Sequence, residues 1–91
     1  MSVNVKIPAQ LRTVTDGEAV AVGEGATVGA VLEDLYGRFP ELKARITDED
    51  GLRRFINVYI GGEDIRFLDG VETAVSDGAE LTILPALAGG A

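Results

Sequence analysis

The residue types that carry most side-chain catalysis are missing from this chain. It has no Cys and no His among its 91 residues, so it offers no thiolate nucleophile, no imidazole base and no ordinary zinc or haem ligand set. The acids from Asp48 to Asp50 lack the alternating spacing and distant Glu of an EF-hand loop, and we interpret them as solvated. Gly61-Gly62 lacks a P-loop lysine and a following helix, so we interpret it as a turn. An autonomous enzyme is therefore the weakest interpretation.

The segment after Pro85 is a candidate for chemistry of the main chain itself. It reads Ala86-Leu87-Ala88-Gly89-Gly90-Ala91 and carries no charge. Residues 86–90, fully extended, would reach roughly 17 Å, which is deep enough to enter a partner's active site. Because glycine has no Cβ, its backbone passes through a narrow channel that a side chain would block. A frayed chain end is the plain alternative.

Composition narrows the class of protein and the partners. Eight Lys and Arg against fifteen Asp and Glu give a net charge of -7, which disfavours nucleic acid and anionic membranes and favours a basic protein partner. No apolar run approaches a membrane span, and the N-terminus lacks the pattern of a secretory signal, so we expect a cytoplasmic protein. The length suits one domain.

The first half of the chain predicts a hairpin and a helix, which belong to the domain that positions the tail. Val3, Val5 and Ile7 alternate with polar residues and predict a strand, and residues 19–22 predict its return partner after a loop over 11–17. Thr27 is placed to cap a helix whose apolar stripe is Val28, Val31, Leu32, Leu35, Tyr36 and Phe39. Pro40 should end that helix.

The second half predicts more strands. Residues 41–54 are expected to form a surface loop, with one helical turn around 42–46. Residues 55–60 and 63–67 flank the Gly61-Gly62 turn as a hairpin, and 80–84 form a last strand that Pro85 ends. The order predicts an α+β fold in which a mixed sheet of four to five strands packs on one main helix. This is the order of a ubiquitin-like β-grasp domain over residues 1–85, with a flexible tail over 86–91.

Several runs of residues in the second half of the chain carry a resemblance to a known family. The stretch Phe55 to Phe67, followed by Leu68-Asp69-Gly70, Ser76-Asp77-Gly78 and the ending from Leu81 to Gly90, resembles the MoaD/ThiS family of ubiquitin-like sulfur carriers. The resemblance covers essentially the whole chain, and its most specific part is the Ile83-Leu84-Pro85-Ala86 ending with its two glycines. Within the family, the chain most resembles the actinobacterial carriers that serve cysteine biosynthesis.

The resemblance implies a protein co-substrate with no cofactor of its own. An E1-like adenylating enzyme would use ATP and magnesium to activate the Gly90 carboxylate, and sulfur would then replace AMP to give a thiocarboxylate. Leu87, Ala88 and Gly89 would thread into partner active sites. A pyridoxal-phosphate-dependent cysteine synthase would accept the sulfur.

One departure from the family concerns the residue after Gly90. Family members are active when the second glycine is terminal, but here Ala91 follows and Gly90 is held in a peptide bond. We therefore expect a peptidase, of the JAMM metalloprotease type associated with such carriers, to cut the Gly90–Ala91 bond. The alternative is that Ala91 is inert.

Partner docking is expected near the root of the tail. Phe67, Leu68 and Leu87 are candidates for an apolar patch, although Phe67 would suit the core equally well, and Arg66 is a candidate contact at its rim. Two other functions stay open. They are the small subunit of molybdopterin synthase and a ubiquitin-like modifier that is joined to lysines of target proteins.

Overall fold

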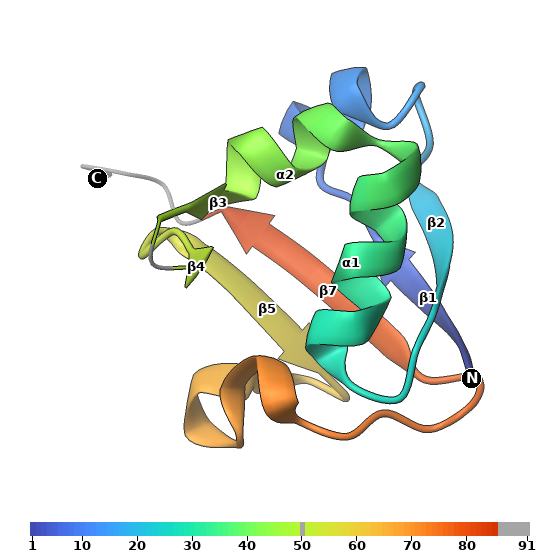
Figure 1. Ribbon diagram of the computed structural model, residues 1–91, viewed down its shortest axis with the longest axis vertical. Helices are drawn as coiled ribbons and strands as arrows, with labels where there is room; N and C mark the ends of the chain where they lie inside the picture. The colour runs from blue at the N-terminus through green and yellow to red at the C-terminus, as the bar shows by residue number, and fades with distance from the viewer. Residues whose placement is uncertain (50, 86–91) are drawn as a thin grey trace.

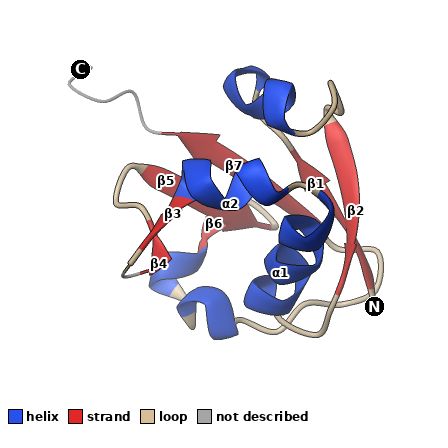
Figure 2. Cartoon of the chain, turned by 45° about the horizontal axis from the view of Figure 1, so that its top comes forward, coloured by secondary structure: helices blue, strands red, loops and turns tan. Residues whose placement is uncertain are grey.

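The fold is a five-stranded mixed sheet with its helices on one face. The computed structural model describes residues 1–49 and 51–85, and the strand order is β2-β1-β7-β5-β6. The strands are β1 (Ser2–Lys6), β2 (Val20–Glu24), β5 (Ile56–Ile60), β6 (Glu63–Asp64) and β7 (Glu80–Pro85). β1 and β7 are parallel, and the other neighbours are antiparallel. Figures 1 and 2 show the helices crossing the sheet, which confirms the predicted β-grasp architecture.

The N-terminal hairpin confirms the strand that was predicted from alternating apolar and polar residues. Val3 and Val5 are fully buried, Asn4 and Lys6 between and after them are exposed, and all five β1 residues pair with β2. The connection is more ordered than the expected turn, because Ala9–Val14 forms a 3-10 helix, η1. Leu11 and Val14 stand three residues apart in it and are both buried, so one apolar side anchors η1 to the core.

The main helix α1 (Val28–Arg38) begins as the sequence predicts. Thr27 Oγ1 accepts a hydrogen bond from the Ala30 N–H at 3.1 Å, which satisfies one of the free donors of the first turn. The apolar stripe is buried against the sheet, with Val31 and Leu35 wholly enclosed. The core therefore lies between α1 and the inward face of the strands.

The helical turn expected around 42–46 is present but is longer and more buried than a surface loop would allow. A second helix, α2 (Pro40–Ile46), follows α1 after Phe39, with Pro40 at its first position, where a missing N–H costs no helical bond. Leu42 and Ile46 lie one turn apart and are fully buried. A short hairpin of β3 (Thr47–Asp48) and β4 (Gly51–Leu52) then leads toward β5.

The predicted strand over 63–67 is too long. β6 ends at Asp64, whose Oδ1 accepts a hydrogen bond from the Arg66 N–H at 2.8 Å. That cap turns the chain into a 3-10 helix, η2 (Ile65–Phe67), and a second one, η3 (Gly70–Glu72), follows in the expected connection. The chain thus leaves the sheet before Ile65 and passes along one side of α1.

Candidate functional site at the end of β7

The root of the tail is the end of a central strand. β7 lies between β1 and β5 and pairs with both, and Pro85, its last residue, has Ile56 as its Cα partner on β5. Leu81 and Ile83 of β7 are fully buried. The sheet therefore fixes the position from which the tail departs. Leu87, Ala88, Gly89, Gly90 and Ala91 lie outside the described residues, and what we expect of them stays a prediction.

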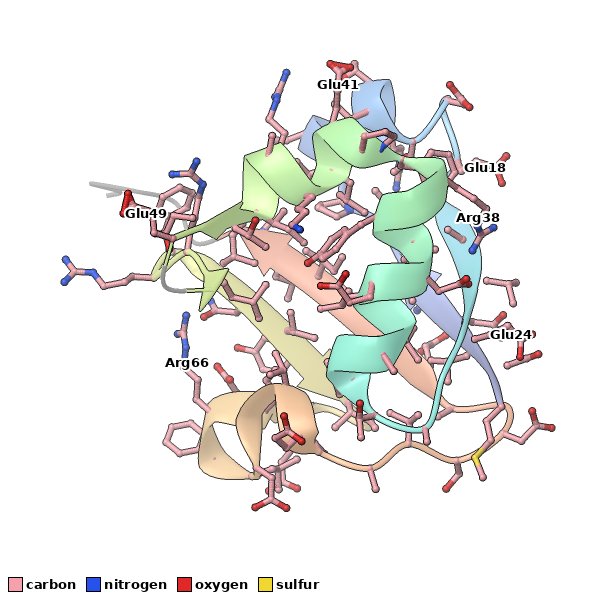
Figure 3. The ribbon with its side chains drawn as sticks, viewed as in Figure 1. Glu18, Glu24, Arg38, Glu41, Glu49 and Arg66 are labelled. Atoms are coloured by element: carbon pink, nitrogen blue, oxygen red, sulfur yellow. The ribbon has the colours of Figure 1, made fainter. Side chains whose placement is uncertain are left out.

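Arg66 connects η2 to the strand beside the tail root. Its guanidinium donates to the carbonyl oxygens of Arg54 at 2.7 Å and Ile56 at 2.8 Å, and to Asn57 Oδ1 at 2.7 Å. Figure 3 shows the side chain extending from η2 toward the start of β5. This geometry gives Arg66 a structural role, because it holds the strand that pairs with Pro85. Arg66 is also exposed, so its predicted contact at the rim of a docking patch stays a prediction.

Phe67 is on the surface, so the alternative that placed it in the core is wrong. Its side chain is 82% exposed, and the neighbouring Leu68 is 40% exposed. Exposure of a large aromatic side chain to water is unfavourable. A partner protein that covers this side chain would gain binding free energy from the apolar area it buries. Both residues stay candidates for docking.

Two apolar side chains at the root itself were not predicted from the sequence. Leu84 is 46% exposed and directly precedes Pro85, and Phe55 is 44% exposed and directly precedes Ile56, the partner of Pro85. Both lie in apolar runs that predict strands, where a buried position is the default expectation. The alternation within β7 would have predicted the exposure of Leu84. Leu81 and Ile83 point to the buried face of the sheet, and Leu84 falls on the opposite face.

The described residues supply no other constellation for catalysis. Within residues 1–49 and 51–85, no group of three or more Asp and Glu side chains is arranged to hold a metal ion. In the same part of the chain, no helix has the length and apolar character needed to cross a membrane. The acid-rich turn near Asp48 is thus not a metal site in the described part.

The fold and the tail root together define a ubiquitin-like β-grasp carrier, in which the candidate reactive group follows the central strand. Residues 5–90 match the ThiS family. The chain belongs to that family and is a non-catalytic sulfur carrier that binds no cofactor itself.

Individual relatives agree with this assignment. The sulfur carrier protein CysO of Mycobacterium tuberculosis is 43% identical over 93 residues, which cover 99% of this chain and all of the relative. A chain in the crystal structure of the Amycolatopsis orientalis BexX/CysO complex is 49% identical, with a TM-score of 0.89 over 93% of this chain and 96% of that one. The small archaeal modifier protein 3 of Haloferax volcanii is 30% identical over 99% of this chain and all of the relative.

Proposed function

We propose that the chain carries sulfur as a thiocarboxylate on Gly90 and donates it to cysteine biosynthesis. The observation that supports this most is the family match, which extends through the tail and stops at Gly90. Similarity to the sulfur carrier CysO over nearly the full length favours the cysteine branch of the family. Pro85, from which the tail starts, pairs with Ile56 of β5, so the sheet fixes the start of the tail.

The chemistry uses the main chain of the carrier and the side chains of its partners. A Gly90 carboxylate oxygen attacks the α-phosphorus of ATP, the bond to pyrophosphate breaks, and an acyl adenylate forms inside an E1-like enzyme. A sulfur nucleophile at the oxidation level of hydrosulfide then attacks the carbonyl carbon, AMP leaves, and the thiocarboxylate remains. Magnesium and cationic groups of that enzyme stabilise the phosphoryl charge. No Cys or His of the carrier is needed.

Removal of Ala91 must come first in this scheme, because a peptide-bonded Gly90 has no carboxylate. A JAMM-type metalloprotease is the proposed agent. Full-length protein and a variant that ends at Gly90 are incubated with ATP, magnesium, sulfide and the adenylating enzyme, and intact masses are measured. Exchange of one oxygen for sulfur is expected only in the variant. A variant that ends at Gly89 is the control, and equal exchange in full-length protein that retains Ala91 contradicts the proposal.

Docking is proposed on the exposed apolar residues near the root and on η2. Leu84 directly precedes Pro85, and Phe55 directly precedes Ile56, the partner of Pro85; Phe67 and Leu68 are exposed at the end of η2. The relative from Amycolatopsis forms a complex with BexX, which supports a stable protein partner for this class of carrier. We expect Leu84→Ser to raise the KM for the adenylating enzyme about tenfold or more, as hot-spot residues do, with little effect on kcat. Val20→Ser, another exposed apolar residue of the same sheet, is the control.

A protein modifier is the second candidate function. The Haloferax relative is named a small archaeal modifier protein, and it covers the same length. The two functions differ in the acceptor, since a modifier forms an isopeptide bond to lysine and releases no sulfur. Tagged carrier expressed in its host and analysed on denaturing gels decides between them. A ladder of conjugates that survives thiol treatment favours the modifier, and its absence together with thiocarboxylate on Gly90 favours the sulfur carrier.

A further inference from the structure

A cleft lies on the helical side of the molecule, away from the exposed sheet residue Leu84. Its volume is about 400 Å³, and its walls come from α1, the end of α2, the β3–β4 hairpin and η3. Leu32, Tyr36, Leu52 and Val71 give it an apolar lining. Gly29 closes one end, since a Cβ there would come within 3.2 Å of the Val71 carbonyl oxygen. The sulfur-carrier chemistry proposed above uses none of these residues.

The rim of the cleft is strongly acidic. Glu33 comes from α1, Asp48 and Glu49 from the hairpin, and Glu72 from η3. The salt bridges within the described residues involve other carboxylates, so Glu33, Glu49 and Glu72 have no cation within ion-pair distance there. Lys43 is the one cationic side chain that lines the cleft in the described part of the chain. The carboxylates of Glu33, Glu49 and Glu72 against one ammonium leave a negative field that favours a cation.

The largely buried side chain of Tyr36, whose hydroxyl opens into the cleft, points to a ligand independently of the charge. Tyr36 is only 8% exposed and lines the cleft. Its ring lies 5.9 Å from Lys43 Nζ, but among the described residues its hydroxyl has no hydrogen-bond partner. No fully enclosed side-chain oxygen or nitrogen lacks a partner there, so the hydroxyl still reaches the space of the cleft. A tyrosine whose ring is buried usually has a hydrogen-bond partner for its hydroxyl, and a ligand in the cleft would supply one.

We propose that the cleft receives an arginine side chain from a basic partner protein. The arginine side chain would lie along the cleft, with its aliphatic stem against Leu32, Leu52 and Val71. Its guanidinium would donate to rim carboxylates and to the Tyr36 hydroxyl. Guanidinium has five donors and no acceptor, which matches a site made of carboxylate and hydroxyl oxygens. Arginine is also enriched at protein interfaces, whereas lysine is depleted.

The position of the cleft suits a partner that also engages the tail root. β4, in the hairpin wall, ends at Leu52, and the chain then reaches Ile56, which pairs with Pro85. Figure 3 shows Glu49 and Arg66 at the same side of the molecule. We therefore expect one partner surface to contact both the side of the tail root and the β3–β4 hairpin that lines the cleft. The site does not depend on Gly90 chemistry, so its test leaves the proposed function untouched.

The test titrates full-length, isotope-labelled protein with the tripeptide acetyl-Gly-Arg-Gly-amide and follows backbone amide shifts by NMR. We expect saturable shifts at Gly29, Gly51 and Glu72. The same peptide with citrulline, a neutral near-isostere of arginine, should bind about fivefold more weakly or worse, because the charge-assisted bonds are lost. Saturable shifts that are equal for the two peptides, shifts spread evenly over all acidic surfaces, or no saturation overturn the proposal.

Variants locate the site. Glu33→Gln with Glu72→Gln should weaken arginine-peptide binding about fivefold or more, and Tyr36→Phe should weaken it about threefold while it leaves the ring in place. Glu18→Gln is the matched control, since Glu18 lies across the molecule from Glu49 (Figure 3) and should leave binding unchanged. The amide spectrum of each variant shows that it is folded. An effect of Glu18→Gln as large as that of the double variant contradicts the assignment.

Discussion

At the scale of single residues, Tyr36 links the cleft to the stability of the fold. Burial, with the neighbouring Glu33 carboxylate as a second cause, raises the pKa of Tyr36 to about 12. An unfolded tyrosine has a pKa of about 10, so the folded chain favours the neutral hydroxyl. The resulting stability is fully present below about pH 10 and is lost as the pH rises through about 12.

Replacement of this hydroxyl should therefore flatten the alkaline stability profile. Between about pH 10 and about pH 12 the wild type should lose of the order of 2 kcal/mol that Tyr36→Phe does not lose. Urea unfolding across that pH range measures the difference. In Tyr59→Phe, phenolate absorbance reports Tyr36 alone, and its midpoint should lie near 12. A midpoint near 10 would show that the site is not desolvated.

The glycine pair makes a second prediction at this scale. If the tail threads through a narrow channel, Gly89→Val should lower the rate of adenylation at least about tenfold, because a branched side chain cannot follow the path of a bare backbone. Ala86→Val adds a branched side chain next to the root and should have little effect. Both are made in the variant that ends at Gly90, with pyrophosphate release as the measure. Wild-type rates for Gly89→Val would remove the argument for threading.

At the scale of elements, the start of α1 depends on a single hydroxyl. Thr27→Ala removes the acceptor for the Ala30 N–H and should lower the free energy of unfolding by about 1 kcal/mol. Chemical denaturation measures the loss. Thr13→Ala is the control, because Thr13 is exposed in η1 and has no side-chain hydrogen bond among the described residues. Equal losses in both variants would mean that the cap contributes nothing specific.

Arg66 makes the corresponding prediction for the strand beside the tail. Lysine keeps the charge, but as a point donor it cannot bridge the carbonyls of Arg54 and Ile56 together with Asn57. Arg66→Lys should destabilise the chain by about 1 kcal/mol and speed amide exchange at the Pro85 end of β5 and β7. Arg45→Lys, at an exposed position of α2, is the control. Unchanged exchange at Ile56 would contradict this role.

The elements also show where sequence patterns suffice. The alternation of β1 and the stripe of α1 each have a long, repeated period and a bounded end, so both were predictable. Only one turn of α2 was predicted, because Pro40 can either end a helix or begin one, and the burial of Leu42 and Ile46 settles which. η2 was missed because a local side-chain cap at Asp64 competes with strand pairing.

The candidate site divides in the same way. The role of the terminal glycines could be predicted from the sequence, because their proposed chemistry uses the main chain and needs no particular arrangement of side chains. The cleft is not visible, since Tyr36 belongs to an apolar stripe and Glu72 lies far along the chain. Only the fold brings α1, the hairpin and η3 together.

At the scale of the whole molecule, the net charge of -7 should govern encounter with basic partners. The association rate with the adenylating enzyme should fall about tenfold between about 0.02 M and about 0.5 M salt, while the dissociation rate changes little. Stopped-flow measurements over that range test this. The double variant Glu33→Gln with Glu72→Gln should show a shallower salt dependence if the cleft faces the partner. A salt-independent association rate would exclude electrostatic steering.

Because β7 lies in the middle of the sheet, the domain can fold only when the chain is complete up to the tail. The strand next to the tail is inserted between β1, from the opposite end of the sequence, and β5, so the sheet closes only when residues 80–85 are present. Contacts of such large sequence separation form late in folding. A chain cut short before Glu80 would lose the middle of its sheet as well as its reactive end. Damaged carriers would therefore unfold rather than compete with intact ones for the activating enzyme.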